Sequence, residues 1–208
     1  PFNEMQRIDF YKKSALNKYN VEEVSNFLKI NKDWNTFVKY FLSKEFINLL
    51  NINFSSNGGQ HYSFSDLNIG YEFSILGDGA QVVPHKDKYG KLLSFVFYFV
   101  PEDWNKKNKY GGTQFYEPKN SFLNKKIFNG SSDFENMNCV TEVIPSSNRL
   151  LIFEPNNTSW HGVAPISTDD SFGRPAFIVT VHRKENDLEN FYNKISFITS
   201  RIQKYLFN

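Results

Sequence analysis

One stretch of the chain decides the fold: Pro84-His85-Lys86-Asp87-Lys88-Tyr89-Gly90-Lys91-Leu92-Leu93-Ser94-Phe95-Val96-Phe97-Tyr98-Phe99-Val100. Its second half, Leu92–Val100, is the longest apolar run and is broken only by Ser94. A run of this length suits a β-strand and is far too short to cross a bilayer. The turn signal Lys88-Tyr89-Gly90 comes directly before it. The stretch therefore predicts a buried strand that follows a tight turn.

The same pattern continues on both sides, from about Gln60 to Arg183. Short β-type runs alternate with turn signals such as Gly77-Asp78-Gly79, Gly111-Gly112 and Pro155-Asn156-Asn157. No helical pattern of ten to fifteen residues separates these runs, which argues against a parallel sheet. We therefore expect an antiparallel sandwich or jelly roll.

Helical periodicity appears on either side of this region. Apolar residues recur every three or four positions from Asp33 to Leu50, and again from Leu188 to Leu206. A shorter helix is predicted from an N-cap at Asn20 through Leu28. The fold class is thus mainly β with flanking helices (α+β). We expect one domain, 1–208, made of a helical part at about 1–57, a β core at about 60–183 and a C-terminal helix at about 187–207.

Composition excludes several classes of protein. The chain has 208 residues with 24 Lys and Arg against 22 Asp and Glu, a net charge of +2, so neither a nucleic-acid partner nor a membrane is expected. Its single cysteine excludes a disulfide framework and cysteine-only metal sites. Residues 1–13 show no apolar signal segment, and we expect a cytoplasmic protein. Composition does not predict an oligomeric state.

The stretch quoted first also contains candidate metal ligands. Alternate side chains of a strand share one face, so His85 and Asp87 can bind the same ion. His161, in Ser159-Trp160-His161-Gly162, is available as a third ligand. Two histidines and a carboxylate form the facial triad of non-haem Fe(II) oxygenases, although these ligands also suit zinc or manganese.

Arg174 is the second candidate functional residue. It is one of only five arginines and opens the predicted strand 175–181. A guanidinium group offers a planar fork of donors that suits a carboxylate. Its position after His161 favours a role in binding an anion near the metal.

In this order and spacing, the motifs of residues 70–183 resemble those of the iron(II)/2-oxoglutarate-dependent oxygenases, specifically the prolyl-4-hydroxylase-like branch. The matching blocks are residues 75–79 with 85–87, 97–104, 111–115, 148–153, 159–163 and 173–176.

The resemblance implies a double-stranded β-helix of the jelly-roll or cupin-like type. It implies that His85, Asp87 and His161 bind Fe(II) and that Arg174 binds the distal carboxylate of 2-oxoglutarate. The implied activity is hydroxylation, with O2, of an unidentified peptide or small-molecule substrate, which releases succinate and CO2. Ascorbate is a candidate reductant.

The chain departs from that family at two kinds of position. Relatives often have a cosubstrate-binding tyrosine where Ile75 or Phe99 stands here, and a hydroxyl residue where Ala176 stands. Tyr71 lies on the same strand face as Ile75 by parity, and we expect its hydroxyl to replace the missing one. We expect Phe99 to face the cosubstrate, so that the neighbouring Tyr98 faces the opposite side of the strand.

Five residues are predicted as walls of the pocket: Leu93, Phe97, Phe99, Trp160 and Ile178. The irregular segment 119–138 is the candidate substrate loop, and His182 is expected to be structural or solvent-facing. Two alternatives stay open at this point. One is a non-catalytic jelly-roll binding module, and the other is a cupin-like metal protein that does not use 2-oxoglutarate.

Overall fold

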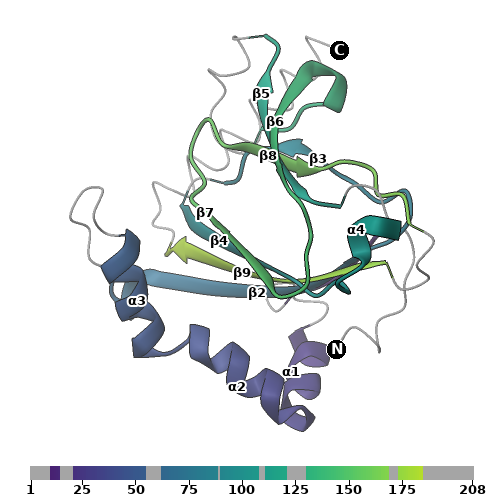
Figure 1. Ribbon diagram of the computed structural model, residues 1–208. Coiled ribbons are helices and arrows are strands. Elements are labelled where there is room, and N and C mark those ends of the chain that lie inside the picture. Colours follow the sequence, from purple (N-terminus) through teal and green to yellow (C-terminus); the bar gives the residue numbers. More distant parts are fainter. Residues whose placement is uncertain are drawn as a thin grey trace.

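Two antiparallel β-sheets face each other in this computed structural model, which describes residues 10–14, 21–54, 62–88, 90–107, 111–120, 130–168 and 173–184 (Figure 1). The larger sheet has the strand order β1-β2-β9-β4-β7, and the smaller has the order β3-β8-β5-β6. This arrangement confirms the prediction of a mainly β, antiparallel jelly-roll core.

The elements have the following bounds. The strands are β1 Phe10–Ser14, β2 Leu67–Leu76, β3 Val82–His85, β4 Lys91–Tyr98, β5 Thr113–Pro118, β6 Met137–Val143, β7 Arg149–Phe153, β8 Trp160–Val163 and β9 Arg174–Arg183. The helices are α1 Val21–Ile30, α2 Lys32–Phe41, α3 Lys44–Phe54 and α4 Trp104–Lys107, with short 3₁₀ helices at Phe64–Asp66 and Phe134–Asn136.

Strand periodicity separates an inner from an outer face of the larger sheet. On β9, Arg174 and Ile178 line a cavity between the sheets, whereas Phe177 belongs to the apolar cluster under the helices. On β2, Leu76 is paired with Arg174 and lines the same cavity. Every second residue of these strands is therefore available to the site, and the others form the core.

Helices α1 to α3 cover the outer face of the larger sheet (Figure 1). The ring of Trp34 on α2 lies edge-on to Phe73 of β2, with 5.1 Å between ring centroids. Phe41 and Phe46 are at most 5% exposed within the same cluster. Burying a side chain of this kind stabilises the fold by roughly 1.5–3 kcal/mol. Packing of helices α1 to α3 therefore stabilises the larger sheet, which contains Arg174.

Two of the helix predictions need correction. The N-terminal part is not helical throughout, because Phe10–Ser14 forms strand β1, which pairs antiparallel with β2. The helix expected from Asp33 to Leu50 is two helices: the Ser43 hydroxyl accepts a hydrogen bond from the Phe46 amide and caps a new helix.

The C-terminal helix predicted at about 187–207 lies outside the described residues. Among those described, no helix is long and apolar enough to span a membrane.

Candidate metal and cosubstrate site

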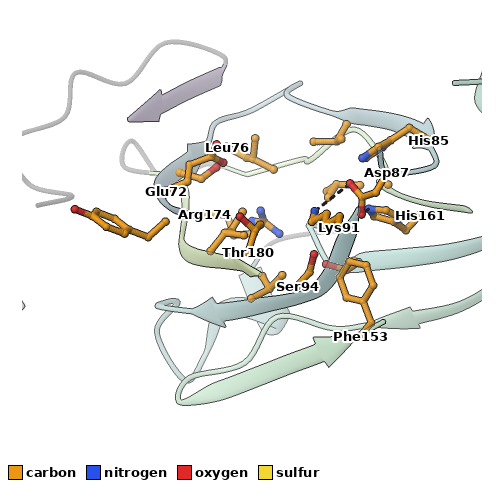
Figure 2. A pocket seen from close by; sticks show the side chains of 18 residues that line it. Glu72, Leu76, His85, Asp87, Lys91, Ser94, Phe153, His161, Arg174 and Thr180 are labelled. Atoms are coloured by element: carbon orange, nitrogen blue, oxygen red, sulfur yellow. Dashed lines mark hydrogen bonds and ion pairs between the residues drawn. The ribbon is translucent and has the colours of Figure 1, made fainter. Parts of the chain in front are cut away.

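A cavity of about 270 Å³ lies between the two sheets and contains the four residues singled out in the sequence. In Figure 2, His85, Asp87 and His161 converge at one side of it, and Arg174 reaches in from another. The apolar lining residues are Leu76, Val82, Val96, Phe153, Val163 and Ile178. Candidate metal ligands and a candidate anion-binding group thus share one largely apolar space.

The two histidines form a cross-strand pair. His85 at the end of β3 is opposite His161 on β8, and their ring centroids are 4.3 Å apart. The close approach of these strands requires the glycine beside His161, since a Cβ on Gly162 would lie 2.5 Å from the Val82 carbonyl oxygen. The backbone pairing therefore fixes both imidazoles relative to each other.

Hydrogen bonds to the backbone also fix which ring nitrogen faces the cavity. His85 Nδ1 lies 3.0 Å from the carbonyl oxygen of Val83, and His161 Nδ1 lies 3.0 Å from that of Ser159. A carbonyl only accepts, so each Nδ1 carries the proton and each Nε2 keeps a lone pair for a metal. Burial, together with the nearby His85, lowers the pKa of His161 to about 4, and the ring is neutral at pH 7.

Asp87 supplies the third ligand. Its side chain is only 11% exposed and lies beside the Lys91 ammonium, which is 3.0 Å from Oδ1. Burial raises the pKa of the Asp87 carboxyl, but Lys91 and the two histidines outweigh it, so the pKa is lowered and the group is ionised.

These donor atoms fit a metal ion. One ligand atom from each of His85, Asp87 and His161 lies within 4.8 Å of the others. Asp87 Oδ2 is buried without a hydrogen bond among the described residues and lies 3.5 Å from His161 Nε2. Both of these atoms are acceptors, and a cation bound between them would satisfy both. A set of two imidazoles and one carboxylate suits Fe(II).

Arg174 is a buried cation. It is 3% exposed, and no described acidic side chain forms an ion pair with it. Its Nη1 donates a hydrogen bond to the Gly111 carbonyl, while Nε has no partner among the described residues. Burial lowers its pKa. A buried charge needs a counter-charge, so this group fits a ligand carboxylate in the cavity.

The ring of Tyr98 lies next to Arg174, which the sequence did not predict. The Arg174 Cζ atom lies 5.5 Å from the centroid of the Tyr98 ring. The Tyr98 hydroxyl accepts from the Thr113 amide at 3.2 Å and is 2.7 Å from the Thr113 hydroxyl. Thr113 lines the cavity, so Tyr98 can orient the Thr113 hydroxyl toward a bound carboxylate.

The assignment of Phe99 to the cosubstrate is wrong. Phe99 lies beyond the end of β4, is 43% exposed and packs on Trp34 of α2. Ile75, where relatives often have a cosubstrate-binding tyrosine, is fully buried in the cluster beneath the helices. The prediction for Phe99 assumed the opposite face of β4.

Of the five predicted pocket walls, Ile178 alone is among the cavity-lining residues. Leu93 and Phe97 face the helices. Trp160 is fully buried in a separate cluster with Tyr116 and Met137. The adjacent His161 points the other way, into the cavity, because neighbouring residues of a strand face opposite sides.

Tyr71 borders the cavity, and its ring also lies 6.2 Å from that of Phe177 on the helix-facing side. Burial raises the pKa of its hydroxyl. Its proposed role as the cosubstrate-binding tyrosine stays a prediction.

Sequence reasoning missed most of the residues that line the cavity, among them Lys91, Ser94 and Phe153. The Ser94 hydroxyl is 1% exposed and has no hydrogen-bond partner in the described chain. Ser94 is the one interruption of the apolar run 92–100, and this interruption indicated that its face of β4 lines a cavity.

The predicted substrate loop, 119–138, lies partly outside the described residues. Its described part adjoins the metal-binding segment: Ser131 pairs with His85, and the Lys86 amide donates to the Gly130 carbonyl at 2.8 Å. Its role in substrate binding stays a prediction.

Comparisons with known proteins agree with this geometry. Residues 71–181, more than half of the chain, match the family model of the 2OG-Fe(II) oxygenase superfamily. A search of curated proteins found no match.

Among solved structures, HygX from Streptomyces hygroscopicus with nickel, 2-oxoglutarate and hygromycin B bound is 10% identical, with a TM-score of 0.42 over 85% of this chain and 83% of that one. HygX with nickel and 2-oxoglutarate bound is 11% identical, with a TM-score of 0.42 over 85% and 82% of the two chains. Peruvianin-I, a cysteine peptidase from Thevetia peruviana latex, is 13% identical, with a TM-score of 0.29 over 61% and 58%. These structural similarities are too low to carry an argument.

The family match spans the whole segment that bears His85, Asp87, His161 and Arg174. On that match, the chain belongs to the 2OG-Fe(II) oxygenase superfamily and is a dioxygenase that uses Fe(II), 2-oxoglutarate and O2.

Proposed function

We propose that this protein is a hydroxylase that oxidises a C–H bond of a small molecule, or of a single side chain of a peptide, and releases succinate and CO2. One observation carries the proposal. A buried arginine without an acidic partner among the described residues lines the same cavity as two histidines and an aspartate whose ligand atoms lie within 4.8 Å of one another.

At one end of the cavity, His85 Nε2, His161 Nε2 and one oxygen of Asp87 would hold Fe(II). Three protein ligands leave coordination positions for the cosubstrate and O2. The backbone hydrogen bonds at both Nδ1 atoms keep the imidazoles in the tautomer that binds a metal.

At the other end, Arg174 would bind the distal carboxylate of 2-oxoglutarate. Its partnerless Nε and the Thr113 hydroxyl are the donors that the described site offers there. The Gly111 carbonyl holds the guanidinium in place through Nη1. A backbone φ of 91° at Gly111 permits this approach, and a Cβ there would lie 3.2 Å from Arg174 Cδ.

When bound, Fe(II) and 2-oxoglutarate would supply the oxidant, by oxidative decarboxylation of the keto acid with O2. The apolar walls formed by Val96, Phe153 and Ile178 would keep bulk water from the reacting C–H bond.

The size of the cavity supports a small substrate. Its volume of about 270 Å³ lies below the roughly 300–1,000 Å³ usual for sites that enclose a drug-sized ligand. With the cosubstrate bound, the remaining space suits a small molecule or one side chain, such as a prolyl ring. The proposal includes a prolyl-4-hydroxylase-like activity, ascorbate as the reductant and a cytoplasmic location.

Consumption of 2-oxoglutarate tests the proposal. Fe(II)-loaded protein in air should form succinate with 2-oxoglutarate alone, and faster with ascorbate or with the correct substrate from a panel of proline-containing peptides and small molecules. Asp87→Ala should abolish succinate formation. Asp33→Ala is the matched control, because Asp33 is exposed on α2 and does not line the cavity.

Metal binding without any succinate from the wild-type protein would contradict a hydroxylase. That result would favour the binding module or the cupin-like protein.

A further inference from the structure

We infer that Lys91 is a positioning residue: it holds Oδ1 of Asp87 so that the carboxylate binds the metal through Oδ2 alone. This inference rests on the proposed function, because it concerns the same metal site. It adds a residue outside the three ligands whose removal should change how the metal binds.

Backbone pairing fixes the two histidines but not the aspartate. His85 and His161 are opposite each other in the ladder between β3 and β8. Asp87 comes two residues after His85, in the connection between β3 and β4, where it belongs to no strand. Its carboxylate therefore needs a side-chain contact to be held at the same metal ion.

Lys91 provides that contact from the opposite sheet. It is the first residue of β4 and is paired with His182 of β9, so its backbone belongs to the larger sheet. Its Nζ donates to Asp87 Oδ1 at 3.0 Å (Figure 2). The two side chains are only 14% and 11% exposed, and water competes little for this hydrogen bond.

The two oxygens of Asp87 consequently have different surroundings. Oδ1 accepts from Lys91, whereas Oδ2 has no hydrogen-bond partner among the described residues and faces His161 Nε2 at 3.5 Å. Oδ2 is thus the oxygen directed at the metal, and Lys91 prevents the carboxylate from turning to bind through both oxygens.

The direction in which metal affinity changes when Lys91 is replaced distinguishes a positioning role from repulsion between its charge and the metal. A lysine near a divalent cation repels it, so loss of the charge alone would tighten metal binding. Loss of an outer hydrogen bond that orients a ligand weakens metal binding, typically by about 10–100-fold. Lys91 also lowers the pKa of Asp87, so the comparison is made at a pH where Asp87 is ionised in every variant. Weaker binding there is not an effect of repulsion between the Lys91 charge and the metal.

Titration of the metal-free full chain with Co(II) tests the inference, since the visible bands of Co(II) report its coordination. Lys91→Met and Lys91→Gln should each bind Co(II) about 10–100 times more weakly than wild type, with changed visible bands, and Lys91→Arg should stay within about threefold. Lys88→Met is the matched control and should bind as wild type does, because Lys88 is exposed in the same connection. Thermal unfolding of each variant by circular dichroism shows that it is folded.

Equal or tighter Co(II) binding with unchanged bands in folded Lys91→Met or Lys91→Gln would overturn the inference while leaving the proposed function intact. Equal weakening in Lys88→Met would also overturn it. Failure of the wild-type protein to bind Co(II) at all would overturn the proposed function together with this inference.

Discussion

Replacing Arg174 with methionine should stabilise the free protein and at the same time prevent it from binding 2-oxoglutarate. Arg174 is buried, its pKa is lowered by burial, and it makes no ion pair with a described residue. Its charge therefore disfavours the folded state until an anion is bound. Methionine has a similar length and fills the same space without a charge.

The magnitudes follow from the contacts of the guanidinium. Removing a poorly compensated buried charge stabilises by roughly 1–4 kcal/mol. Loss of the hydrogen bond to the Gly111 carbonyl reduces this gain in stability by about 1 kcal/mol. Two charge-assisted hydrogen bonds to a carboxylate contribute about 1.5–3 kcal/mol each. We thus expect a net gain in stability of about 0–3 kcal/mol and a loss of cosubstrate affinity of at least about 100-fold.

Urea unfolding of the metal-free protein and 2-oxoglutarate titration of the metal-loaded protein measure the two effects. Arg149→Met is the matched control: Arg149 also donates through Nη1 to a backbone carbonyl, that of Ile144 at 2.7 Å, but is exposed. This control should bind 2-oxoglutarate as wild type does. The reasoning is refuted if Arg174→Met binds 2-oxoglutarate within about tenfold of wild type, or if it is less stable than wild type.

Three further substitutions test other parts of the site. Gly162→Ala places a Cβ 2.5 Å from the Val82 carbonyl oxygen. It should lower the free energy of urea unfolding by about 1–3 kcal/mol and weaken Co(II) binding. Unchanged Co(II) affinity would show that the histidine pair does not depend on the close approach of β3 and β8. Tyr98→Phe leaves the buried Thr113 amide and hydroxyl without their partner, which should cost about 1–3 kcal/mol; an unchanged urea midpoint would count against the hydrogen bonds described here. Burial, with the nearby lysines, lowers the pKa of His182 from 6.5 to about 4, so the unfolded chain takes up this proton first as the pH falls. The metal-free wild type should therefore lose roughly 1–2 kcal/mol more stability than His182→Gln between pH 6.5 and pH 4, allowing for the partial exposure of the ring. His161, whose pKa is also lowered to about 4, contributes in both proteins. Equal losses in both proteins would contradict the assignment.

The sequence predicted the antiparallel β core and the order of its motifs because these depend on local patterns. Turn signals and the absence of intervening helical patterns were sufficient to exclude a parallel sheet. Strand parity predicted that His85 and Asp87 share a face, and the family resemblance implied that His161 and Arg174 belong to the same site. The structure brings all four to one cavity.

The errors came from the choice of face on strands that are apolar on both sides. On β4 the prediction placed Phe97 and Phe99 inside. The structure has Ser94 and Val96 at the cavity and Leu93 and Phe97 under the helices. Both faces of this strand are buried, so hydrophobic alternation could not distinguish them. Ser94, a lone polar residue, would have done so.

Long-range contacts explain the remaining errors. The strand at Phe10–Ser14 forms by pairing with β2, far along the chain, so local periodicity does not show it. The ion pair between Lys91 and Asp87 depends on how the connection after β3 returns to the larger sheet. Spacing alone gives no measure of that geometry.

The measurement that tests the central claim most directly is an anaerobic titration of the Fe(II)-loaded protein with 2-oxoglutarate, followed by visible absorption. We expect a saturable charge-transfer band, because a keto acid anchored by Arg174 would reach an iron ion held by His85, Asp87 and His161. The band should be lost in Asp87→Ala and should need at least about 100-fold more 2-oxoglutarate in Arg174→Met. Absence of the band in wild-type protein that demonstrably holds iron would contradict the account.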